Sequence, residues 1–255
     1  MKILGDYHTH TIYSKSNHGK STIQENVDIA KKKGLKEIAI TDHGYGHIFY
    51  GVDKNKVENL KEEIKKANKD DIKVLYGIES NLLNFKGEID YSDNFNDMDI
   101  ILMGYHSAGR KYLFNGCFFH YFNYMARIFG TSKWLKNKNT QAYLKALDRY
   151  DIDIVTHLNS GVKVDVIKIA EKCIEKNVYI ELNGRRLNFT KKEIDEMVKM
   201  GCKFIINSDA HICSNVAKLR KPMNFSIINQ IPKELICNLD QIPKFKNHKN
   251  IGVVE

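Results

Sequence analysis

The chain has 255 residues, 42% of them hydrophobic, and its 40 lysine and arginine residues against 31 aspartate and glutamate residues give a formal charge of +9. This composition is typical of a globular protein and argues against disorder over most of the chain. No apolar run approaches the ~20 residues of a membrane-spanning helix, so we expect no membrane partner.

The first residues and the cysteines indicate the compartment. Charge appears at Lys2 and Asp6, before any apolar segment typical of a secretory signal could begin. The five cysteines form no CxxC pair, and an odd number without a signal is typical of free thiols. We therefore expect a cytoplasmic protein.

Seven short apolar runs follow one another along the chain and predict buried parallel strands. Each run is rich in isoleucine, valine, leucine or tyrosine, as strands covered on both faces are. The runs are 2–7, 37–41, 73–78, 99–105, 153–156, 178–182 and 203–207.

Amphipathic segments between these runs predict helices. The first helix is expected at 21–33, with Ser21 or Thr22 as its N-cap and Gly34 at its end. The others are expected at 53–68, 139–149, 164–176 and 190–200. Seven strands separated by helices predict a parallel α/β fold in one domain over 1–255, either a barrel or an open sheet.

Two stretches interrupt this alternation. The stretch 110–138 is long and rich in aromatic residues. We interpret it as a lid inserted over the active site or as an aromatic helix pair packed on the fold. The second interpretation is slightly favoured. Residues 221–255, which include the three prolines, are expected to be a C-terminal extension.

Side chains that can bind metal ions follow the predicted strands. Active sites of parallel α/β folds lie at the C-terminal ends of the strands, so these side chains should meet at one rim. They are His8, His10, Asp42, His43, Glu79, His106, His157, Glu181, Asn183, Asp209 and His211. His18 can reach the same rim, whereas His47, His120 and His248 are interpreted as surface or hydrogen-bonded residues.

The types of side chain predict the metal. His8 and His10 are two positions apart, so on an extended strand both rings face the same side and can bind one ion. Imidazole combined with carboxylate suits zinc, manganese or iron(II). The number of candidate ligands exceeds one coordination sphere, so we expect two or three ions. Such clusters activate water and neutralise phosphoryl charge.

Six motifs resemble those of the polymerase and histidinol phosphatase (PHP) family. They are DYHTHT from residue 6, TDHG from 41, GIE from 77, GYH from 104, VTH from 155 and SDAH from 208. Their order and spacing cover residues 8–211 and make the resemblance specific. It implies a distorted (β/α)7 barrel with a trinuclear metal site at the C-terminal rim of the strands.

The resemblance also implies a ligand set. The first ion would be bound by His8, His10, Glu79 and Asp209, the second by Glu79 as a bridge with His106 and His157, and the third by His18, His43 and His211. Catalysis would depend on Glu79 and Asp209. His18 follows His10 by eight positions, more than relatives usually have, so residues 14–17 are expected to bulge into solvent. The alternative is that water replaces His18.

Further residues are assigned to supporting roles. Asp42 is expected to accept a hydrogen bond from a metal ligand or, equally, to cap a helix. Arg185, Arg186 and Arg110 could hold a substrate phosphate through the guanidinium group. For each arginine the alternative is a solvated surface charge.

The predicted function is a metal-dependent phosphoesterase in which a metal-bound hydroxide attacks a small phosphomonoester. Histidinol phosphate is one candidate substrate. The alternative is a 3′–5′ exonuclease or related nucleic-acid phosphodiesterase, which the charge of +9 would favour. Ranked lower are an amidohydrolase-like C–N hydrolase and a binding domain without metal. The sequence predicts no oligomeric state.

Overall fold

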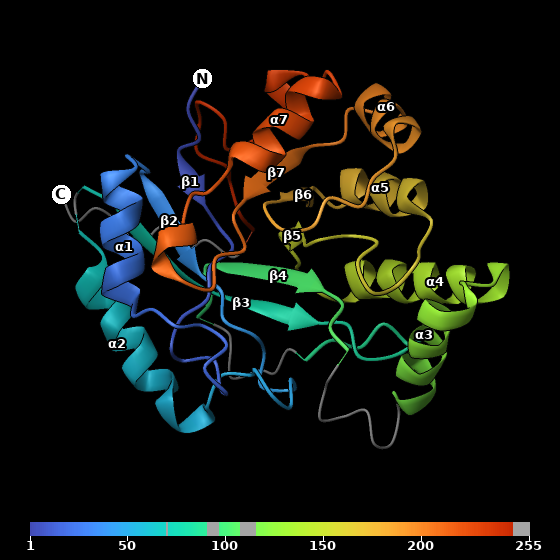
Figure 1. Cartoon of the computed structure of the whole chain (residues 1–255), viewed down its shortest axis with the longest axis horizontal. Helices are drawn as coiled ribbons and strands as arrows, with labels where there is room; N and C mark the ends of the chain where they lie inside the picture. Colours follow the sequence, from blue (N-terminus) through green and yellow to red (C-terminus); the bar gives the residue numbers. More distant parts are fainter. Residues whose placement is uncertain (70, 91–96, 108–115, 247–255) are drawn as a thin grey trace.

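A computed structural model describes residues 1–69, 71–90, 97–107 and 116–246 (Figure 1). Seven parallel strands lie in these ranges, and each pairs with the next in sequential order. They are β1 (Gly5–Asp6), β2 (Glu37–Ile40), β3 (Lys73–Asn81), β4 (Ile100–Gly104), β5 (Ile154–Val155), β6 (Tyr179–Asn183) and β7 (Phe204–Asn207). They form a nearly closed barrel, so the predicted (β/α)7 fold is confirmed.

Helices connect the strands and cover the outside of the barrel. In Figure 1, α1 and α2 cover one flank, and α4, α5 and α6 cover the other. The α-helices are α1 (Ile23–Lys32), α2 (Val57–Ala67), α3 (Cys117–Phe129), α4 (Lys133–Arg149), α5 (Val166–Glu175), α6 (Lys191–Lys199) and α7 (Arg220–Ile228). The 3₁₀ helices are η1 (Lys54–Lys56), η4 (Cys213–Asn215) and η5 (Lys233–Leu235). None of the helices in the described ranges has the length and apolarity that a membrane crossing requires.

Local sequence signals account for the helix starts. Thr22 caps α1 in a reciprocal capping box with Glu25, and Thr190 caps α6 in the same way with Glu193. The start of α4 was predicted wrongly at residue 139, because Ser132 accepts a hydrogen bond from the backbone N–H of Leu135 and begins the helix at Lys133.

The hydrophobic core has two layers, because successive side chains of a strand point to opposite faces. Ile38 and Ile40 of β2 belong to the outer layer, which also contains Ile23 and Val27 of α1. Ala39, between them, belongs to the inner layer. The inner layer consists of Tyr7, Ala39, Leu75, Ile100, Leu102, Ile154, Ile205 and Phe245. This inner layer fills the middle of the barrel, so buried polar side chains gather at the two ends of the strands.

Side chains join β1 to β7, where the order of paired strands begins and ends. Asn238 is fully buried, and its amide donates to the carbonyl oxygens of Gly5 and Ile206 and accepts from the N–H of Ile206. The backbone N–H of Tyr7 donates to Oδ1 of Asn207 at 2.9 Å. Side-chain amides thus replace part of the backbone pairing that would close the barrel.

The predicted C-terminal extension is part of the barrel as far as it is described. After α7, Phe245 packs against Tyr7 with ring centroids 4.8 Å apart, and the N–H of Lys246 donates to Oδ1 of Asp153. This segment therefore closes the N-terminal mouth of the barrel. Residues 247–255 lie outside the described ranges.

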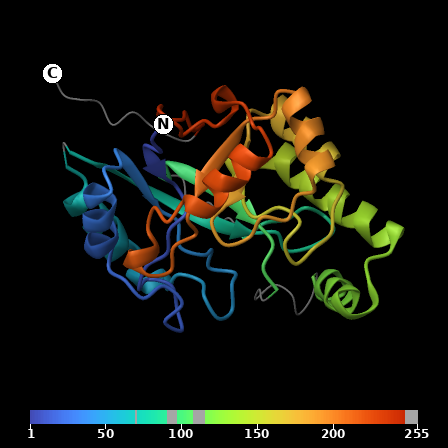
Figure 2. The same ribbon diagram turned by 45° about the horizontal axis from the view of Figure 1, so that its top comes forward.

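The aromatic stretch predicted at 110–138 includes α3 and the start of α4, and its residues 110–115 lie outside the described ranges. Figure 2 shows α3 beside the start of α4 at the edge of the molecule. Phe119 is buried against Tyr105 and Phe85, with ring centroids 5.4 and 4.9 Å apart. Most other aromatic rings of α3 are exposed. The five cysteines are free, as expected.

Asn238→Ala should lower the free energy of unfolding by about 3 kcal/mol, because buried backbone groups left without partners each cost ~1–3 kcal/mol. Urea denaturation measures the loss. The control is Asn137→Ala at an exposed position of α4, which should change stability by less than about 0.5 kcal/mol. A loss below about 1 kcal/mol for Asn238→Ala would show that its amide does not hold β1 to β7.

Candidate metal centre

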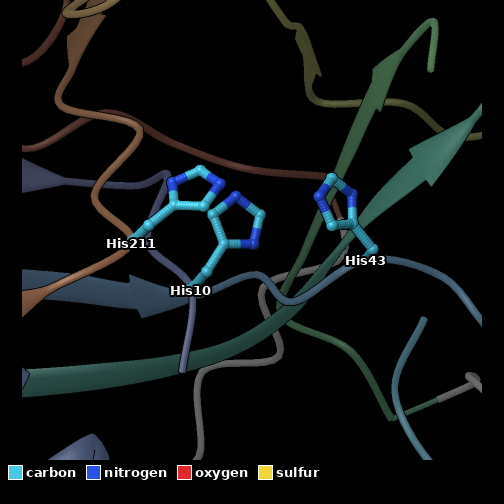
Figure 3. Close-up of side chains that lie close together, drawn as sticks. All are labelled: His10, His43 and His211. Atoms are coloured by element: carbon cyan, nitrogen blue, oxygen red, sulfur yellow. The ribbon is translucent and has the colours of Figure 1, made fainter. Parts of the chain in front are cut away.

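The histidine and carboxylate side chains predicted from the strand ends come together in one buried cluster. His10, His43 and His211 follow β1, β2 and β7, and Figure 3 shows their rings facing a common space. The ring centroid of His10 lies 4.6 Å from that of His43 and 4.4 Å from that of His211. One ligand atom from each of the three residues lies within 4.8 Å of the others, which is close enough to hold one ion.

Glu79 of β3 lies at the centre of the cluster, and its two oxygens face different histidines. Oε1 lies 2.7 Å from Nε2 of His157 and 3.3 Å from Nε2 of His106. Oε2 lies 3.0 Å from Nδ1 of His43 and 3.3 Å from Nε2 of His8. A carboxylate with rings on both sides has the arrangement of a ligand that bridges two ions.

A second carboxylate, Asp209, approaches the cluster from the end of β7. Its Oδ1 lies 3.8 Å from Nε2 of His8 and 3.6 Å from Nε2 of His10. These three residues form another group whose ligand atoms lie within 4.8 Å of one another. His43, Glu79 and His106 form a further group of this kind.

His18 reaches the cluster despite its unusual spacing from His10. Its Nε2 lies 3.1 Å from Nε2 of His43 and 2.7 Å from Nε2 of His211. The expected bulge is shorter than 14–17, because Ser14 is buried and only Lys15, Ser16 and Asn17 of that stretch are exposed.

Asp42 holds the loop that carries His18. Oδ1 accepts from the N–H of Thr11 at 2.7 Å and from Oγ of Ser14 at 2.5 Å, while Oδ2 accepts from Oγ1 of Thr11 at 2.6 Å. The predicted hydrogen bond from a metal ligand is missing among the described contacts, since Nδ1 of His10 lies 4.0 Å from Oδ1. Burial raises the pKa of Asp42 to about 6, against the lowering effect of these hydrogen bonds.

Several buried histidine nitrogens are available to bind metal ions. Within the described part of the chain, Nε2 of His8, both ring nitrogens of His10 and Nδ1 of His43 are buried without a hydrogen bond of acceptable geometry. Buried polar atoms without partners are costly and rare in native proteins. Divalent ions would supply the missing partners, so the residues present fit the metals that the sequence predicts.

The charges in the cluster call for cations. Burial lowers the pKa of His8, but Glu79, Glu181 and Asp209 outweigh it and raise that pKa well above its ordinary value. Burial raises the pKa of Glu79 and of Asp209, yet the surrounding histidine rings hold both well below the ordinary range. The carboxylates are therefore ionised at neutral pH and attract positive charge.

Most of the other rings are neutral. Burial, aided by the charge of His211, lowers the pKa of His10 to about 3 and that of His18 to about 4. Burial also lowers the pKa of His43 well below its ordinary value. Neutral imidazole is the form that binds metals. These rings therefore do not have to release a proton when a metal ion binds at neutral pH.

The sequence predicts that Glu181 of β6 lies at the rim, but it indicates no role for this residue. Its Oε1 lies 2.8 Å from Nδ1 of His8, and its Oε2 accepts from the N–H of His157 and from the amide of Asn183. Partners of this kind fix the orientation and tautomer of a metal-binding histidine. Its position at a strand end was the signal that could have identified it.

Two residues that were given no role at the site line the cavity beside the cluster. His47, interpreted as a surface or hydrogen-bonded residue, is buried and stacks on His43 and Tyr50 with ring centroids 5.1 and 4.7 Å apart. The backbone N–H of Tyr50 donates to Nδ1 of His47 at 3.0 Å, so one of the two interpretations of His47, a hydrogen-bonded residue, is confirmed. Arg127 of α3 lines the same cavity of about 420 Å³. Both come from outside the strand ends, where the sequence pattern carries no signal for them.

The predicted phosphate-binding arginines of the β6–α6 connection line this cavity too. Nη1 of Arg185 lies 3.3 Å from Oδ1 of Asp209 and 2.9 Å from Nδ1 of His211. Nη1 of Arg186 donates to Oγ of Ser160 at 3.2 Å. Arg110 lies outside the described residues.

Backbone geometry at the rim is adapted to the cluster. His157 and Asp209 have φ angles of 27° and 55°, in a region that non-glycine residues rarely adopt. Such conformations persist where the surroundings enforce them, and they gather at functional sites. At Gly104 a β-carbon would meet the side chains of Thr156 and His157, so glycine leaves room for the His157 ring.

The chain resembles known families and proteins. A family model described as PHP domain matches residues 6–185. A protein of Clostridium acetobutylicum named "Probable phosphatase" is 30% identical over 94% of this chain and 92% of its own length. A "Probable phosphatase" of Shewanella sediminis is 28% identical over 93% of this chain and 90% of its own.

A solved structure shares the fold. It is histidinol phosphate phosphatase from Lactococcus lactis in complex with zinc, L-histidinol and phosphate, with a TM-score of 0.58. The alignment covers 98% of this chain and 99% of that one at 17% sequence identity. At this identity the likeness concerns the barrel alone.

Glu181→Gln should weaken zinc binding at the cluster by about 10–100-fold, because His8 loses the carboxylate that orients its ring and makes it more basic. Competition with a chelator of known affinity measures the change. Glu196→Gln, at an exposed position of α6, is the control and should bind zinc like the unaltered protein. Equal zinc affinity in the two variants would mean that Glu181 does not support the site.

Proposed function

We propose that this chain, which belongs to the PHP domain family and is a metal-dependent phosphatase, hydrolyses small phosphomonoesters at a site for three divalent ions. Two ions are supported by Glu79, whose two oxygens face different pairs of rings. A third is supported by His18, whose Nε2 lies close to the rings of His43 and His211. One or two ions would leave part of this cluster of rings without a partner.

We take the ligand set that the resemblance to the PHP family implies. Among the groups whose ligand atoms lie within 4.8 Å of one another, His8, His10 and Asp209 agree with it, whereas His10 also lies near His43 and His211. One ion takes His8, His10, Glu79 and Asp209; a second takes Glu79, His106 and His157; a third takes His18, His43 and His211. The distances between ring nitrogens of 3.1 and 2.7 Å support the third group. Zinc, manganese and iron all suit imidazole with carboxylate.

The protein's own groups position the phosphate. When bound, the metal ions activate a water molecule and neutralise phosphoryl charge. Arg185 and Arg186 line the same cavity as the cluster, so their guanidinium groups can donate to phosphate oxygens. In the reaction the oxygen of water bonds to phosphorus, the bond from phosphorus to the ester oxygen breaks, and that oxygen takes up a proton.

A small substrate is preferred over nucleic acid for this site. The metal cavity is about 420 Å³, within the range of small-molecule pockets. Histidinol phosphate is one candidate, because a histidinol phosphate phosphatase has the same fold. The cytoplasm is the proposed compartment.

A substrate panel tests the proposal. The protein is loaded with zinc, manganese or iron(II) and assayed on phosphomonoesters that include histidinol phosphate, beside single-stranded DNA at several salt concentrations. Phosphomonoesters should be hydrolysed faster than DNA, and only after metal loading. Preferred cleavage of DNA, with a rate that falls steeply as salt rises, would favour the exonuclease instead.

Arg185→Ala should raise KM by about tenfold with a smaller change in kcat if the guanidinium binds phosphate equally in substrate and transition state. Steady-state kinetics at saturating metal measures both constants. Arg149→Ala, at an exposed position of α4, is the matched control and should leave both unchanged. An unchanged KM in Arg185→Ala would mean that Arg185 does not bind the phosphate of the substrate.

A further inference from the structure

A cavity near the metal cluster lies beside α7. It has a volume of about 820 Å³ and is lined by residues of the β6–α6 connection, the end of β7 and α7. Arg185 and Asp209 line both this cavity and the one that contains the metal cluster. We call it the α7 cavity. Figure 1 shows α7 next to β7, the strand that leads to Asp209.

Three cations line the α7 cavity without acidic partners. Lys218, Arg220 and Lys221 have no carboxylate within 4.0 Å among the described residues. Lysines elsewhere on the helices, such as Lys172 and Lys191, do form such ion pairs. Unneutralised charge of one sign in a cleft attracts an anion.

The position of Lys221 relates these charges to the metal cluster. Its Nζ donates to the backbone carbonyl oxygen of Arg185 at 2.7 Å. The side chain of Arg185 in turn lies 3.3 Å from Asp209. An ammonium group of α7 is therefore next to the residue that borders both cavities.

The rest of the lining is apolar. Leu187, Phe225 and Ile228 line the cavity, and 74% of the Ile228 side chain surface is exposed. An exposed apolar wall beside unpaired cations suits a ligand with an apolar body and an anionic group.

A second cavity flanks the metal cluster but is less well placed to receive the leaving group of a substrate. It measures about 420 Å³ and is lined by polar residues that include Asn123, Arg127, Lys163 and Arg186. No residue assigned to the metals lines it, whereas Asp209 lines the α7 cavity. The second cavity shares Arg127, Gly161 and Arg186 with the metal cavity, so what distinguishes the α7 cavity is that its lining includes Asp209, a proposed metal ligand.

We propose that the α7 cavity binds the leaving group of the substrate and selects leaving groups that combine an apolar body with a second anionic group. This selection would disfavour histidinol phosphate, whose leaving group carries an amine and no anionic group. This inference rests on the proposed function, since it requires a phosphomonoester at the metal cluster. Hydrolysis breaks the bond between phosphorus and the ester oxygen, so the alcohol product remains in the α7 cavity with its anionic group near Lys218 and Lys221.

Two matched substrates test the proposal: 4-(2-carboxyethyl)phenyl phosphate and its methyl ester. They differ in one methyl group and in the charge far from the phosphate, and the bond that breaks at phosphorus is the same. The unaltered, metal-loaded protein should have the higher kcat/KM for the acid. The double variant Lys218→Met/Lys221→Met should lower kcat/KM for the acid by about tenfold and for the ester by less than about threefold. Methionine keeps the apolar stem of lysine.

Lys163→Met is the matched control, because it removes one cation from the second cavity. It should leave kcat/KM for the acid unchanged. A loss in Lys163→Met that exceeds the loss in the double variant would overturn the proposal and place the anion in the second cavity. Equal kcat/KM for acid and ester in the unaltered protein would overturn it while leaving the phosphatase intact. Failure to hydrolyse either substrate would overturn the proposed function and this inference together.

Discussion

The structure depends on one electrostatic constraint: buried carboxylates need positive charge within the barrel. Glu79 is 1% exposed, and histidine rings surround it. Water cannot solvate these groups, so the energy of the folded state depends on cations at this position. Burial lowers the pKa of His8, yet three neighbouring carboxylates raise it well above its ordinary value, so the cluster favours positive charge. Glu181 and Gly104 then orient the rings or give them room.

The same constraint bears on how the barrel closes. His8 and His10 follow β1, and Asp209 and His211 follow β7, so the cluster lies across the junction where strand pairing is incomplete. At the rim the N–H of His10 donates to the carbonyl oxygen of Ala210 at 2.8 Å. At the opposite end the amide of Asn238 and the ring of Phe245 complete the closure. Metal ions bound at the rim would join the first and last strands and would thereby couple metal binding to closure of the barrel.

The fold and most of the candidate site could be predicted from the sequence, because both depend on local patterns. Short β-branched runs mark the strands, threonines mark the starts of α1 and α6, and the polar residue after each strand falls at the rim. Residues that depend on tertiary contacts were not predictable in this way. His47 is buried only because its loop folds over the rim, and Arg127 reaches the cavity only because α3 packs there. Asp42 was expected to accept a hydrogen bond from a metal ligand or, equally, to cap a helix. In the structure its oxygens accept from Thr11 and Ser14 and hold the loop before His18.

The most direct test of the account is anomalous X-ray diffraction at the zinc edge from crystals grown with zinc. We predict three anomalous peaks within the cluster: one between His8, His10 and Asp209, one between His106 and His157, and one between His18, His43 and His211. Zinc-to-nitrogen distances of about 2.0–2.1 Å are expected for the histidine ligands. Crystals that contain zinc but show no peak between these side chains would contradict the claim that the buried cluster is a metal centre.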